Sequence, residues 1–136
     1  MNKKTLTILG PALVGLVVVL ILLYSTRATD QGAELYAVHC QSCHMENGQG
    51  LRGVIPPVAK ADYLSIHRAE LACLIRYGAE NPMVVNGKTY QQAMPGNEQL
   101  TETDIANVLN YVLKSWGNEE KPLSLQEVQN QLEACD

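Results

Sequence analysis

Cys40-Gln41-Ser42-Cys43-His44 tells more about this 136-residue chain than any other stretch of it. The stretch has the form Cys-x-x-Cys-His, the pattern of covalent c-type haem attachment. Two cysteines three residues apart lie on one face of a helical turn, so both thiols reach the vinyl groups of one haem. The histidine that follows then lies under the porphyrin. The pattern predicts one covalent haem c, attached at Cys40 and Cys43, with His44 as the proximal iron ligand.

Two other kinds of site also use a Cys-x-x-Cys pair. A zinc site normally has a second pair of ligands, but the remaining cysteines, Cys73 and Cys135, are isolated. A thioredoxin-like redox pair needs a preceding βαβ pattern, which residues 1–39 lack. Haem is therefore favoured over both.

The N-terminal segment predicts export. Thr5 to Tyr24 contains no charged residue, and its 20 residues would span about 30 Å as a helix, one hydrocarbon core. Lys3 and Lys4 precede it, which places the N-terminus in the cytoplasm. We expect residues 5–24 to anchor the protein in the inner membrane with the haem domain on the periplasmic face. The alternative is a signal peptide cleaved near Thr26-Arg27-Ala28.

The charge after this segment restricts the partners. All 14 acidic residues but only seven of the ten basic ones lie after residue 29, which gives a formal charge of −7. This charge argues against nucleic acid or an anionic membrane surface as a partner. It suits docking onto a basic patch of a redox protein or a respiratory membrane complex. Equally, it can simply keep the domain soluble.

Three segments are expected: an anchor and linker (1–29), a haem domain (30–118) and a tail with a short helix (119–136). No alternation typical of strands appears, so the predicted fold is all-α with long loops wrapped around the haem. The predicted helices are 31–40 after a Thr29-Asp30 cap, 61–77 in one or two pieces, one from Thr101 to near Trp116, and 124–135. The predicted loops are 45–60 and 78–99.

Three methionines are candidates for the other side of the iron. Met45 follows His44 directly and cannot reach the opposite face. Met94 lies 50 residues after His44, in the loop before the helix that starts at Thr101, and Pro95 stiffens its approach. Met83 also follows a proline and stays open as the second choice. We predict Met94, because a thioether suits a haem that shuttles electrons.

Gly32 to Gly117 resembles a class I monohaem cytochrome c. The resemblance rests on the attachment motif, on Gly32 and Tyr36 at the expected spacing in the first helix, and on Ala93-Met94-Pro95-Gly96 as a distal-ligand loop. It implies that the Pro56 carbonyl accepts the Nδ1–H of His44 and that Val58 packs on the haem. The stretches around 85–90 and 106–111 are similar to membrane-attached or fused bacterial cytochrome c domains that serve respiratory enzymes.

The two remaining cysteines form an even pair in an exported chain, so we predict a Cys73–Cys135 disulfide. It would fasten the C-terminal helix to the 61–77 helix. A free buried thiol at 73 and a frayed C-terminus are the alternative.

Three polar or aromatic side chains are weaker candidates for the haem environment. Tyr90 and Trp116 are expected to donate hydrogen bonds to the haem propionates, and Arg52 to pair with them by charge. Ordinary packing or solvent exposure is the alternative for each of them.

Two protein ligands leave no open position on the iron, so no catalytic residue and no small-molecule substrate are predicted. The prediction is a membrane-tethered one-electron carrier between respiratory complexes. A fixed haem subunit of one respiratory assembly is the alternative, and an enzyme with a five-coordinate haem is a third possibility.

Overall fold

The computed structural model describes the backbone of residues 3–80 and 82–135, and side chains from residue 13 onward except those of 24–30, 81 and 136. The helices are α1 (Lys3–His39), α2 (Gln41–His44), α3 (Tyr63–Ile66), the 3₁₀ turn η1 (Arg68–Glu70), α4 (Leu71–Tyr77), α5 (Glu102–Lys114) and α6 (Leu125–Glu133). The strands are β1 (Gly78–Ala79), β2 (Met83–Val85), β3 (Lys88–Tyr90) and β4 (Met94–Pro95). The sequence predicts an all-α fold, and the described part of the chain is mostly helical but also contains these short strands.

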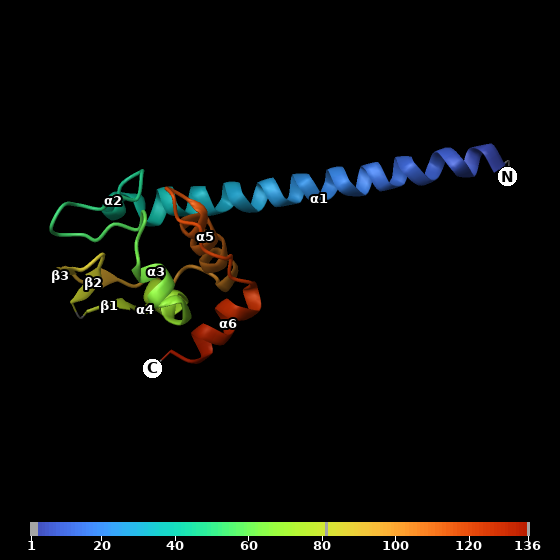
Figure 1. Ribbon diagram of the computed structural model, residues 1–136. Helices are drawn as coiled ribbons and strands as arrows, with labels where there is room; N and C mark the ends of the chain where they lie inside the picture. The colour runs from blue at the N-terminus through green and yellow to red at the C-terminus, as the bar shows by residue number, and fades with distance from the viewer. Residues whose placement is uncertain (1–2, 81, 136) are drawn as a thin grey trace.

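Helix α1 is one unbroken helix whose N-terminal part projects away from the rest of the fold (Figure 1). The predicted helix start at Thr29-Asp30 is wrong, since the helix continues through both residues. Within the part of the chain that is described, we find no helix with the length and apolarity to cross a membrane. The side chains of residues 5–12 and 24 of the predicted anchor lie outside that part.

The C-terminal end of α1 crosses α5 around a glycine. Gly32 packs against the backbone of Asn107 and the side chain of Tyr111, and a Cβ at Gly32 would lie 2.8 Å from the Tyr111 Cβ. One turn later, Tyr36 is buried and its ring lies 5.5 Å from Tyr111 and 4.9 Å from Trp116. Small and aromatic side chains thus let the two helices approach closely.

We expect Gly32→Ala to lower the free energy of unfolding by about 2 kcal/mol, because the added methyl group overpacks this crossing. Gly15→Ala is the matched control, since a Cβ at Gly15 has no neighbour within 4 Å. Chemical denaturation followed by circular dichroism compares the two variants. Equal stability would contradict the close packing described here.

The 78–99 segment is not the plain loop that the sequence predicts. Strands β2 and β3 form an antiparallel hairpin that pairs Met83 with Tyr90, and β1 pairs with β4 so that Ala79 lies opposite Met94. Asn86 and Gly87, with φ of 51° and 72°, form the hairpin turn. Two positive φ angles fit a two-residue turn between twisted strands, which explains the Asn-Gly pair.

Helices α5 and α6 both begin with a capping box. The Thr101 side chain accepts from the Asp104 N–H, and the Asp104 carboxylate accepts from the Thr101 N–H. Ser124 and Glu127 form the same pair of hydrogen bonds at the start of α6. The apolar face of α5 carries Ile105 and Leu113, which are fully buried. Both helices therefore start as the sequence predicts.

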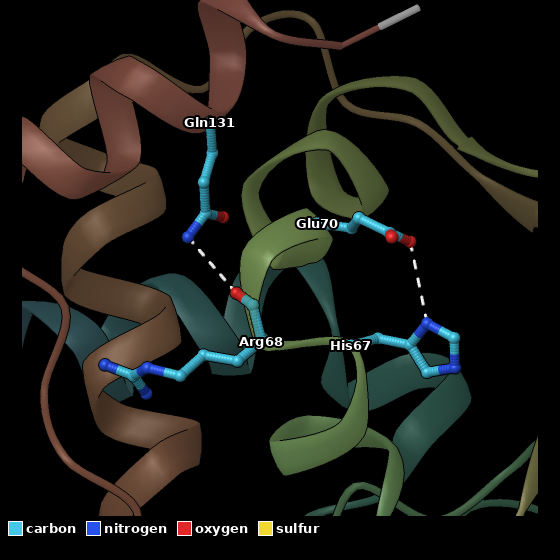
Figure 2. Close-up of polar contacts among 4 residues, drawn as sticks. All are labelled: His67, Arg68, Glu70 and Gln131. Atoms are coloured by element: carbon cyan, nitrogen blue, oxygen red, sulfur yellow. Dashed lines mark hydrogen bonds and ion pairs between the residues drawn. The ribbon is translucent and has the colours of Figure 1, made fainter.

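The tail is fastened to α4 and to η1. Cys73 and Cys135 form a disulfide with a Cα–Cα distance of 5.7 Å. Gln131 accepts from the Ala72 N–H at 3.0 Å and donates to the Arg68 carbonyl at 3.1 Å (Figure 2). The guanidinium of Arg68 donates to the carbonyls of Lys121 and Pro122. The tail is thus an ordered part of the domain.

Candidate haem site

The two thiols of the motif lie on a helical turn that follows α1 directly. The Cys40 N–H donates to the Tyr36 carbonyl at 2.9 Å, and the His44 N–H donates to the Cys40 carbonyl at 2.9 Å. Both cysteines are free and face one cavity. Burial, and then the neighbouring Cys43, raise the pKa of the Cys40 thiol to about 11, so it is protonated at neutral pH in the protein without haem.

The imidazole of His44 is held in one tautomer. Its Nδ1 lies 3.1 Å from the Pro56 carbonyl oxygen, which only accepts hydrogen bonds. Nδ1 therefore carries the proton, and Nε2 has a free lone pair for a metal. Burial lowers the pKa of His44 although the bond to Pro56 opposes this, so the ring is neutral at pH 7, the form that binds iron.

Backbone hydrogen bonds within the 45–60 loop hold Pro56 in place. The Gly48 carbonyl accepts the N–H groups of Val58 and Ala59 at 2.8 and 2.9 Å, and the Gly50 N–H donates to the His44 carbonyl at 3.0 Å. A Cβ at Gly50, where φ is 66°, would lie 2.5 Å from the Pro56 oxygen. Glycine at this position allows the loop to bring the carbonyl to the histidine.

The cavity has a volume of about 400 Å³ and brings together residues far apart in the sequence. Cys40, Cys43 and His44 line it, and so do Met94 and Met83. The two methionines come from different strands, β4 and β2. Met83 is buried, and Met94 is partly exposed.

The wall of the cavity is almost wholly apolar. Leu71, Leu74 and Ile75 of α4 contribute to it, as do Val108 and Leu109 of α5. Pro56 and Val58 line it as the resemblance implies. Paired thiols, a neutral imidazole with a free Nε2, a thioether and an apolar wall together fit a covalently held haem.

The weaker candidates lie outside this cavity. Arg52 and Tyr90 line a second, more open cavity of about 630 Å³, which shares Ile55 and Pro57 with the first. Trp116 instead lies beneath the 45–60 loop, where a Cβ at Gly48 would be 2.7 Å from its ring.

His67 also lies outside both cavities. Its ring stacks on Tyr63 with centroids 4.1 Å apart, and its Nδ1 is 3.6 Å from the Glu70 carboxylate (Figure 2).

Asn118 is a structural residue that the sequence analysis above does not single out. It is buried, and its amide donates to the Val58 carbonyl and the Val112 carbonyl, each at 2.8 Å. Asn118 thus joins the 45–60 loop to α5. The available signal is a polar residue directly after the Trp116-Gly117 turn that follows α5.

The family model for cytochrome c matches residues 29–116, which include the thiols, His44 and Met94. The chain belongs to the cytochrome c family. Its cofactor is covalent haem c, and its activity is electron transfer, not catalysis of a substrate reaction.

Relatives of this cytochrome c include both small cytochromes and subunits of larger enzymes. Cytochrome c-552 of Thermus thermophilus is 37% identical over 98 residues, 69% of this chain and 66% of that protein. The cytochrome c subunit of a quinone alcohol dehydrogenase from Gluconobacter oxydans is 34% identical over 65% of this chain and 19% of that subunit. Subunit CcoP of a cbb3-type cytochrome c oxidase from Cereibacter sphaeroides is 32% identical over 71% of this chain and 30% of that subunit.

Proposed function

We propose that this chain is a membrane-tethered one-electron carrier whose haem is ligated by His44 and Met94. One observation carries the proposal: His44, with Nε2 left free by Pro56, faces the same apolar cavity as Met94. A bound haem c supplies an iron that alternates between ferric and ferrous states. With His44 and Met94 both holding the iron, the haem would pass electrons and would leave no position for a substrate to bind.

The protein residues have separate tasks in this proposal. Cys40 and Cys43 hold the haem covalently, and Pro56 fixes the orientation of the His44 ring. The apolar wall excludes water, which favours the less charged ferrous state. Arg52 and Tyr90, at the neighbouring open cavity, are proposed to face the propionates, where a cation and a hydroxyl meet carboxylates.

A redox titration followed by visible absorption tests the carrier function. We expect one reversible one-electron transition and no carbon monoxide binding by the ferrous protein, because no axial position is open. Rapid carbon monoxide binding, or turnover of peroxide, would overturn the proposal.

The membrane tether rests on the N-terminal part of α1. The large apolar side chains between Leu13 and Leu22 are each 47–64% exposed. This part of the helix projects from the fold (Figure 1). A helix apolar on all sides and exposed to water is unfavourable, whereas lipid would cover it.

Fractionation and mass measurement test the tether. We expect the intact chain with its haem in the membrane fraction, released by detergent and not by salt. A soluble periplasmic protein that begins after residue 28 would contradict the tether and favour the cleaved signal.

A fixed subunit of one respiratory assembly is the second candidate. The names of two relatives favour it, since they are a dehydrogenase subunit and an oxidase subunit. Copurification with a large complex in mild detergent would support this candidate, and isolation as a free monomer would support the shuttle.

A further inference from the structure

A side-chain contact joins the end of α1, which leads into Cys40, to the segment that follows Met94. His39 ends α1, directly before the thiol Cys40, and Asn97 lies three residues after Met94. The Nδ2 atom of Asn97 lies 3.2 Å from Nδ1 of His39. Within the described residues, no other side-chain hydrogen bond joins α1 to the 92–99 loop.

The direction of this hydrogen bond follows from the second bond that Asn97 makes. Its Oδ1 accepts the N–H of Gln99 at 3.1 Å, so the amide NH₂ group is the one that faces His39. His39 therefore accepts through an unprotonated Nδ1. Both the NH₂ group and the oxygen of the Asn97 amide are therefore hydrogen-bonded.

The backbone of Asn97 is fixed as well. Its N–H donates to the carbonyl of Ile75 at 2.8 Å, and Ile75 lines the haem cavity. The backbone carbonyl of the next residue, Glu98, accepts from the Arg76 guanidinium at 2.8 Å. Asn97 thus ties the distal loop both to α4 and to the haem-attachment segment.

We propose that His39 and Asn97 are positioning residues that hold Met94 on the iron. Movement of the distal loop away from the haem has to break their hydrogen bond. The proposal rests on Met94 being the distal ligand, as proposed above. It adds that the ligand is held by a contact outside the cavity.

Imidazole binding reports how often Met94 leaves the iron, because imidazole binds ferric haem only when the methionine has left. Its apparent affinity is the intrinsic affinity multiplied by the population of the open state. The loss of a hydrogen bond worth about 1–1.4 kcal/mol raises that population about fivefold to tenfold. Loss of the His39–Asn97 hydrogen bond is therefore expected to make imidazole bind more tightly.

The experiment titrates imidazole into the full-length ferric protein with its haem. We expect His39→Ala and Asn97→Ala each to raise the imidazole affinity about fivefold to tenfold. The double variant should match the stronger single one, because both remove the same bond. His39→Gln, whose amide oxygen can accept from Asn97, should stay near the wild-type affinity.

Asn110→Ala is the matched control. Asn110 also uses both ends of its amide, at 2.9 and 2.7 Å to the backbone of Leu123, but it holds the tail. Its imidazole affinity should equal that of the wild type even if the fold is less stable.

Suppose first that the wild type shows the absorption band of a methionine–iron bond. Unchanged imidazole affinity in His39→Ala and Asn97→Ala, or an equal rise in Asn110→Ala, would then overturn the role of His39 and Asn97 and leave the Met94 ligation standing. A wild type without that band would overturn the ligation and the role of His39 and Asn97 together.

Discussion

Met94→Ala is expected to remove the distal ligand and to lower the reduction potential by on the order of 200 mV, because axial ligands set haem potentials over about 0.8 V. The thioether stabilises the ferrous state, so its loss favours the ferric state. The ferric spectrum should change from low spin to high spin, and the ferrous protein should bind carbon monoxide. Potentiometric titration and absorption spectroscopy measure both effects.

Met83→Leu is the control, because Met83 lines the same cavity from β2 and differs little in volume from leucine. It should keep the low-spin spectrum and nearly the wild-type potential. The opposite pattern, with Met83→Leu losing the ligand and Met94→Ala keeping it, would assign the distal position to Met83.

The double variant Cys73→Ser/Cys135→Ser should lower the free energy of unfolding by about 4 kcal/mol, because the disulfide closes a sequence separation of 62 residues in the unfolded chain. Its ferric spectrum should not change, since neither cysteine lines the haem cavity. Urea denaturation followed by far-ultraviolet circular dichroism measures the loss.

Wild-type protein treated with a reductant for disulfides provides the comparison and should unfold at the same urea concentration as the double variant. A double variant as stable as the oxidised wild type would show that the hydrogen bonds of Arg68 and Gln131 hold the tail without the disulfide.

Local sequence patterns predicted the elements whose causes are local. The thiols and histidine of the motif need one helical turn, and the capping boxes at Thr101 and Ser124 mark helix starts within four residues. The 83–90 hairpin also has a local signal, Asn86-Gly87 directly after the apolar run Met83-Val84-Val85, although the sequence pattern predicts only a loop over 78–99.

Features that depend on distant residues could not be predicted in this way. The ring of Trp116 packs under Gly48, 68 positions earlier in the chain. The contact of His39 with Asn97 spans 58 residues. Such contacts depend on how the helices cross, and no local pattern encodes the crossing.

The ferric absorption spectrum of the full-length protein tests the central claim most directly. With His44 and Met94 both bound, the account predicts a low-spin haem c with the weak far-red band of a methionine–iron bond. A high-spin spectrum without that band would mean an open iron position, and it would contradict the assignment of this chain as an electron carrier with a fully ligated haem.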